Sequence, residues 1–211
     1  MKPTISKSQY LRGLQCNKAL WLSRNRKDLQ LEPSPAKKDI LDTGNLIGKL
    51  AMDNYPAGVE VTNEYWDING AIKATNMYIE DGNNIIFEAT AMHPITGAYS
   101  KIDILKRVEN TDLWDLIEVK SSTQVKEYHK DDLAFQYYVF NNSGYKIRYC
   151  YMMLIDSSYE RNGDIDPENI LRLIDISEDV KDKQDKVNKI TNKLCNSLSE
   201  SKELTEQIGE K

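Results

Sequence analysis

Three charged residues lie within two apolar segments of this sequence. Asp103 interrupts the run Ile102–Leu105, and Glu118 and Lys120 lie in the run Leu116–Lys120. Because side chains alternate along a strand, Glu118 and Lys120 are expected to project from the same face. Burying two carboxylates and an ammonium is costly unless the charges are compensated, and a divalent cation would offset that cost. The pattern therefore predicts a metal site with a lysine beside it.

The two strands that carry this cluster are separated only by the turn Asn110–Asp112. They are therefore expected to pair antiparallel, which places cross-strand neighbours about 5 Å apart. Asp103 and Glu118 could then share one Mg²⁺ ion, with the carbonyl of Val119 as a further oxygen ligand. A metal-activated water can attack a phosphodiester, and Lys120 could orient it or neutralise developing charge. The alternative is that both carboxylates are solvated and Lys120 is a surface partner.

The hydrophobic pattern predicts an α/β fold with a mixed central sheet of about four to five strands flanked by helices. We expect an N-terminal helical region over residues 1–80, a core over 81–176 and a long polar C-terminal helix over 177–211. Helices are predicted from Ser6 through Trp21, over 38–54, 68–78 and 125–142, and from Ser177 toward Ile208. Core strands are predicted over 84–90, 98–108, 113–119 and 146–155, with shorter ones at 59–61 and 170–176.

Composition favours a cytoplasmic globular protein. The chain has 211 residues, of which 40% are hydrophobic and 29% charged, so one domain is expected. No apolar run approaches the roughly 20 residues that span a membrane. The three cysteines are far apart and form no CxxC pair, so neither a disulfide framework nor a self-sufficient zinc site is expected.

The net charge of −5 argues weakly against a general nucleic-acid binder, but the charges are unevenly distributed. Basic residues gather in the first forty positions, interleaved with aromatic ones. Such a pattern can follow a single strand and stack on its bases, although a solvated helix face is the simpler interpretation. The candidate nucleic-acid contacts are Lys7, Tyr10, Arg12, Lys18 and Arg24.

The helix after the second apolar strand carries His129, Asp132 and Gln136 at positions i, i+3 and i+7. This stripe could face the same groove, with Gln136 touching a metal-bound water or a phosphate. For His129 an ordinary exposed polar face is the preferred interpretation.

The ordered set of motifs resembles a known family. Asp103 followed by Glu118-Val119-Lys120 is similar to the PD-(D/E)XK nuclease core, and Gln136-Tyr137-Tyr138 is similar to the RecB-type nuclease motif on the next helix. The segments Cys16–Trp21 and Tyr159–Gly163 are similar to a bacterial branch related to the CRISPR-associated RecB-like exonucleases. The resemblance extends over roughly residues 5 to 180.

This resemblance implies a restriction-endonuclease-like fold and a nuclease that hydrolyses DNA, either single-stranded or from its ends, with Mg²⁺ or Mn²⁺. The implied catalytic residues are Asp103, Glu118, Lys120 and Gln136. The implied metal ligands are Glu88, Asp103, Glu118 and the main chain of Val119. Glu88 is included only because of the family pattern, and the alternative interpretation is that it is an ordinary carboxylate at the end of a strand.

Two departures from the family pattern matter. Many relatives hold an iron–sulfur cluster with cysteines near the C-terminus, but Cys150 and Cys195 lack clustered spacing, so no cluster is expected. Phe140 stands where the RecB-type motif places a tyrosine after Gln136, so Tyr137 or Tyr138 takes that role or the role is absent.

Two other functions remain open. One is a catalytically silent nucleic-acid-binding or protein-interaction module on the same fold. The other is a hydrolase of another substrate, for which a GxSxG-like serine context is missing.

Overall fold

The computed structural model of this chain describes residues 4–30, 32 and 34–199. Within these residues a seven-stranded mixed sheet has the strand order β2-β3-β4-β5-β6-β7, and β1 pairs with β4. Strands β3, β4 and β5 form an antiparallel meander, β6 lies parallel to β5, and β7 is antiparallel to β6. The strands are β1 (Ile5–Ser6), β2 (Val59–Glu60), β3 (Ile85–Met92), β4 (Ala98–Arg107), β5 (Leu113–Lys120), β6 (Lys146–Ile155) and β7 (Leu171–Asp175).

The expected fold class is confirmed, with a larger sheet than four to five strands. The additional members are short: β1 and β2 have two residues each, and both are parallel to the strand they join. Strand β5 lies inside the sheet between β4 and β6 and is largely buried, as is typical of a strand with apolar side chains on both faces.

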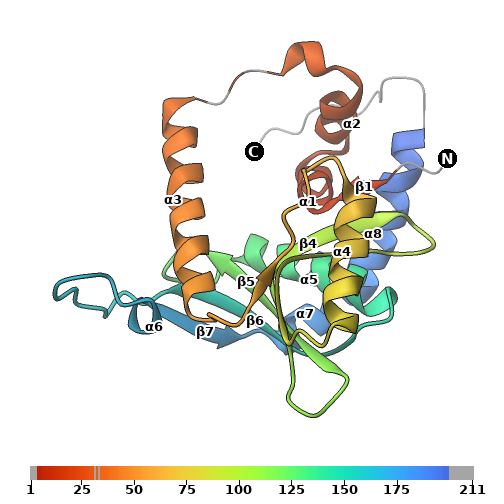
Figure 1. The fold of residues 1–211 in the computed structure, drawn as a ribbon. Helices are drawn as coiled ribbons and strands as arrows, with labels where there is room; N and C mark the ends of the chain where they lie inside the picture. Colours follow the sequence, from red (N-terminus) through yellow and green to blue (C-terminus); the bar gives the residue numbers. More distant parts are fainter. Residues whose placement is uncertain (1–3, 31, 33, 200–211) are drawn as a thin grey trace.

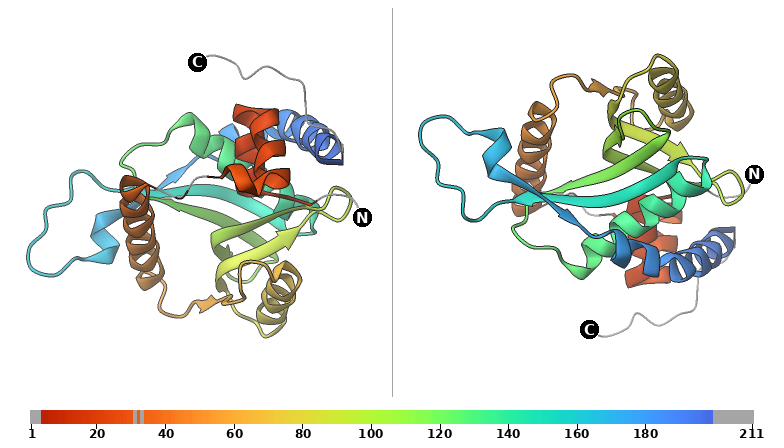
Figure 2. Two further views of the ribbon diagram at one scale, coloured as in Figure 1. Left: turned by 90° about the horizontal axis from the view of Figure 1, so that it is seen from above. Right: turned by 90° about the horizontal axis from the view of Figure 1, so that it is seen from below.

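Helices lie on both sides of this sheet (Figures 1 and 2). Helix α5 packs against β4 and β6, with α1 and α8 behind it, whereas α3 packs on β5 and α4 along β3. The helices are α1 (Lys7–Gln15), α2 (Asn17–Asn25), the 3₁₀ turn η1 (Lys27–Leu29), α3 (Pro35–Asp53), α4 (Ile68–Glu80), α5 (Glu127–Asn142), α6 (Pro167–Ile170), α7 (Ser177–Asp182) and α8 (Gln184–Ser199). No helix in the described part of the chain is long and apolar enough to cross a membrane.

The N-terminal helix begins as predicted but is divided in two. Ser6 caps α1 by accepting a hydrogen bond from the backbone N–H of Gln9, and the Gln9 side-chain Oε1 accepts one from the backbone N–H of Ser6. The helix ends at Cys16, which has an extended backbone (φ −162°, ψ 118°) and uses its Sγ to cap α2. The C-terminal helix is likewise divided at Lys183 into α7 and α8, and its predicted continuation beyond Ser199 lies outside the described residues.

Two strands change their inward face at the same level of the sheet. The paired residues Phe87 and Ile104 belong to the core beneath α3, whereas the next inward pair, Ala89 and Ile102, belongs to the core beneath α5. Glu88 lies at this break and has a left-handed backbone (φ 55°), which is uncommon for a residue other than glycine. The break exposes Glu88 and its neighbour in β4, Asp103, toward one pocket.

Helix α3 is only partly covered by the rest of the molecule. Ile47 and Ala51 are buried in the core beneath it, but Leu46 is 53% exposed. The N-terminal half of α3 stands clear of the sheet (Figure 1).

Candidate active site

Asp103 lies where the β4–β5 ladder ends. The paired residues run from Arg107 and Trp114 to Ile104 and Ile117 and go no farther. Beyond this point the Asp103 Oδ2 atom accepts a hydrogen bond of 2.6 Å from the backbone N–H of Val119. A side chain therefore replaces the main chain as the link between the strands, and the second carboxylate oxygen has no hydrogen bond to a described residue.

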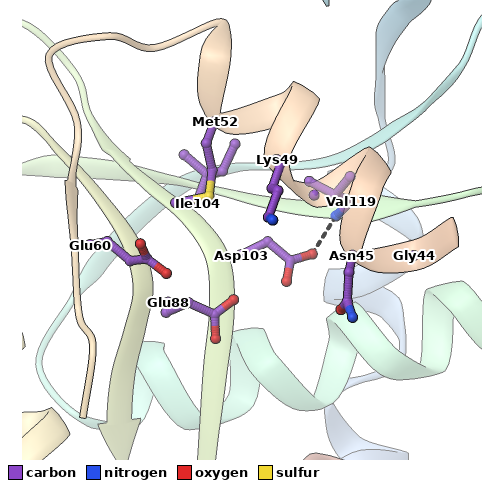
Figure 3. A pocket seen from close by; sticks show the side chains of 10 residues that line it. Gly44, Asn45, Lys49, Met52, Glu60, Glu88, Asp103, Ile104 and Val119 are labelled. Carbon is purple, nitrogen blue, oxygen red and sulfur yellow. Dashed lines mark hydrogen bonds between the residues drawn. The ribbon is translucent and has the colours of Figure 1, made fainter. Parts of the chain in front are cut away.

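A pocket of about 360 Å³ opens in front of this carboxylate. Figure 3 shows Glu60, Glu88 and Asp103 directing their carboxylates into the space beside α3, with Lys49 above Asp103 and Asn45 to its right. Glu88 also pairs with the ammonium of Lys101 at 3.3 Å. The remaining lining residues are Gly44, Gly48, Met52, Ile104 and Val119.

Glu118 belongs to a separate, buried network on the α5 side of the strands. Its Oε1 atom accepts from Lys120 Nζ at 2.5 Å and from Lys7 Nζ at 2.8 Å, and its Oε2 atom accepts from Gln136 Nε2 at 2.7 Å. Asp132 joins the network by accepting from Lys120 Nζ at 2.7 Å and from Gln136 Nε2 at 3.0 Å. The predicted proximity of Glu118 and Lys120 on one strand face is thus observed.

The network fixes the charges of its members. Burial opposes ionisation of Glu118, but the ammonium groups of Lys120 and Lys7 prevail and hold its pKa well below the usual range. Burial alone would lower the pKa of Lys120, yet the carboxylates of Glu118 and Asp132 raise it above its ordinary value. Lys120 is therefore a cation and suits charge stabilisation rather than proton abstraction.

Asp103 forms no ion pair with a described residue at salt-bridge distance, unlike Glu118 and Asp132. Burial, and then the nearby charge of Glu118, raise the pKa of Asp103 to about 7, against the opposing effects of Lys7 and Lys120. A half-buried carboxylate with a free oxygen beside other carboxylates is the chemistry that a hard divalent cation satisfies. The oxygen donors near Asp103 therefore fit Mg²⁺ or Mn²⁺, although no three His, Cys, Asp or Glu side chains of the described residues already converge closely enough to form a metal cluster.

The predicted metal ligands are thus divided between two places. Glu88, Asp103 and Val119 line one pocket, but Glu118 is turned toward the lysines. Gln136 Oε1 is buried without a hydrogen-bond partner in the described part of the chain, an arrangement that commonly indicates a missing water or ion.

The five predicted nucleic-acid contacts differ in burial and in the partners they bind. Lys7 contacts Glu118, and the Arg24 guanidinium donates to the carbonyl of Thr4 at 2.6 Å. Arg12 is exposed on α1 and Lys18 is half-buried on α2. The base-stacking role of Tyr10 is wrong, because its ring is buried and stacks on Phe135 with a centroid distance of 4.4 Å.

His129 is also placed differently from the exposed polar face that was preferred. It is buried at the start of α5, where its Nδ1 atom accepts from the backbone N–H of Lys126. Burial, reinforced by the charges of Lys120 and Lys126, lowers the pKa of His129 to about 4, so the imidazole is neutral at physiological pH.

Several residues of the site were not predicted from the sequence, because only the tertiary structure brings them there. Glu60, Asn45 and Lys49 reach the pocket only because β2 joins β3 and α3 packs over β5. For Lys7, the partner is 111 residues away in the chain. Asp132 did have a local signal, since it shares a helical stripe with Gln136.

Comparisons with known proteins support the fold. No family model matches this sequence, and no curated protein matches it. The crystal structure of an alkaline exonuclease from Laribacter hongkongensis is similar, with a TM-score of 0.54 at 14% identity over 93% of this chain and 88% of that one. The structure of that enzyme in complex with dAMP has a TM-score of 0.49 at 14% identity over 93% and 90% of the two chains. At such identity the first likeness establishes a shared fold and leaves activity to the residues of the site.

Proposed function

We propose that this protein is a Mg²⁺- or Mn²⁺-dependent nuclease of the PD-(D/E)XK type, in its RecB-like branch, that hydrolyses phosphodiester bonds of DNA. The observation that carries the proposal is the Asp103 carboxylate, with one oxygen free, beside the Glu118–Lys120–Gln136 network at the end of two paired strands. The fold shared with an alkaline exonuclease supports it. Single strands or DNA ends are the proposed substrates.

Each residue has a role that follows from its position. Asp103, Glu88, Glu118 and the Val119 carbonyl would hold the cation, which when bound supplies an activated water and positive charge against phosphate oxygens. Lys120 remains an ammonium beside them and can stabilise negative charge that develops on the phosphate. Gln136 holds Glu118 and Asp132 in place through Nε2 and keeps Oε1 available to accept from a water.

The proposal is tested by metal-dependent cleavage of a labelled single strand and of a linear plasmid. Wild-type protein should cleave with Mg²⁺ or Mn²⁺ and lose activity in EDTA. Asp103→Asn and Lys120→Met should each lower the rate at least about 100-fold, the scale typical for removal of one electrostatic stabiliser. Lys73→Met, which removes an exposed charge of α4 outside the site, should cleave normally.

Binding of the same strand without cleavage under any metal condition would contradict the nuclease. It would favour the catalytically silent nucleic-acid-binding module. The pairing of Glu118 with two lysines is consistent with that alternative, because a paired carboxylate is less available to a metal ion. Equal cleavage by wild type and both site variants would place the chemistry elsewhere.

A further inference from the structure

Lys7 occupies an unusual position for a residue near the start of the chain. Its Nζ atom donates to Glu118 Oε1 at 2.8 Å and lies 3.6 Å from Asp132 Oδ1. The side chain of Lys7 is 26% exposed, whereas that of Glu118 is 1% exposed. Solvent, and a solute carried by it, can therefore reach the lysine while the glutamate is covered.

Lys7 is also the more weakly held of the two lysines. Lys120 is bonded at short range to both carboxylates of the network, at 2.5 Å and 2.7 Å. Lys7 has one short contact, with Glu118, and one long contact, with Asp132. An incoming anion would displace Lys7 from Glu118 more readily than it would displace Lys120.

The pairing of Lys7 restricts what Glu118 can bind. Both carboxylate oxygens of Glu118 are taken, Oε1 by two ammonium groups and Oε2 by Gln136. A cation beside Asp103 that also bound Glu118 would have to displace one of these partners, and like charges a few ångströms apart repel strongly in a buried site.

Resting on the nuclease function proposed above, we propose that Lys7 is a positioning residue that couples nucleic-acid binding to metal binding. Without a nucleic acid, Lys7 holds Glu118 away from Asp103. A backbone phosphate that arrives beside Lys120 takes over the Lys7 ammonium and releases Glu118 to the cation. By linkage, the nucleic acid then tightens metal binding, and the metal tightens nucleic-acid binding by the same factor.

The test is a calorimetric titration of Mg²⁺ into the whole protein, with and without a ten-nucleotide single strand made of phosphorothioate linkages. For wild type we expect the strand to tighten Mg²⁺ binding about tenfold, within the usual range of coupling between sites. For Lys7→Met we expect tight Mg²⁺ binding without the strand and little further change when the strand is added. Lys73→Met, with the same loss of charge away from the site, should behave as wild type.

Two more variants control for unfolding of the Lys7→Met protein and for a role of Lys7 in packing rather than in charge. Lys7→Gln loses the charge but keeps a hydrogen-bond donor, and it replaces Lys7→Met if circular dichroism shows that the methionine variant is unfolded. Lys7→Arg keeps the charge and should retain the coupling.

Weaker Mg²⁺ binding in the neutral Lys7 variants, or coupling that persists in them, would overturn the role of Lys7 and leave the nuclease standing. Folded wild-type protein that binds no Mg²⁺ with or without the strand would overturn both.

Discussion

Replacing Asp103 by Asn should stabilise the metal-free protein at pH 8. The folded-state pKa of Asp103 is about 7, above its ordinary value of 3.8. A group with a raised pKa in the folded state stabilises it while protonated, and this contribution is lost as the pH rises from 3.8 to about 7. Above pH 7 the folded protein therefore carries an unfavourable charge that Asn lacks.

The size of the effect follows from the same values. A difference of about three pH units is equivalent to about 4 kcal/mol at about 1.36 kcal/mol per unit. Asp103 is half-buried, and water screens such a charge, so we expect about half of this, or about 2 kcal/mol. For a chain of this size that corresponds to a rise in Tm of about 4–8 °C. Asn can keep the bond from Val119 N–H, because its Oδ1 is also an acceptor.

The assay is urea denaturation followed by circular dichroism in EDTA at pH 8 and pH 5. Asp103→Asn should exceed wild type in free energy of unfolding at pH 8 and approach it at pH 5. Adding Mg²⁺ should make wild type the more stable of the two at pH 8, because an ion that binds only the folded state stabilises it. The variant has lost a carboxylate that binds the ion. Asp53→Asn, on the exposed side of α3, controls for the change in net charge. A variant no more stable than wild type at pH 8, or equally stabilised at both pH values, would refute this reasoning.

Two further predictions concern the pocket and the basic helices. Gly48→Leu should leave the protein equally stable or stabilise it by roughly 0.5–1 kcal/mol in urea denaturation, because leucine favours a helix more than glycine does and an added Cβ meets no atom within 4 Å. The leucine side chain should also enter the pocket and lower kcat/KM at least tenfold. Unchanged cleavage would show that this pocket is not on the substrate path. Neutralising Arg12, Lys18 and Arg24 together should flatten the salt dependence of DNA binding by about one unit of slope for each phosphate that the variant no longer neutralises. The kcat at saturating DNA should stay unchanged. A variant with the wild-type slope would indicate that DNA instead follows Lys126 and Lys130, at the start of α5.

Local rules predicted much of what holds the site. The apolar runs around Asp103 and Glu118 predicted two buried strands, and the short turn between them predicted their antiparallel pairing. The start of the first helix near Ser6 was also predicted, because the capping box there joins residues only three apart.

The direction of the two carboxylates was not predictable in the same way. A strict period of two assumes an unbroken pleat, but the strands change face at Glu88 and Asp103. Asp103 therefore lines the pocket under α3, whereas Glu118 lies with α5. Glutamate at a positive φ has no local sequence signature, because the tertiary structure imposes it. The contact of Lys7 with Glu118 depends on the packing of α1 against α5 and β4, which no local pattern encodes.

The long separation between Lys7 and Glu118 also bears on when the site can form. Lys7 is synthesised early, but its partner follows 111 residues later. Loops of that length close slowly compared with local helices and hairpins. The strand meander and α5 must therefore be in place before α1 can settle on them. Until synthesis has passed Gln136, the charged network lacks some of its members, so the proposed site is incomplete in a shorter nascent chain.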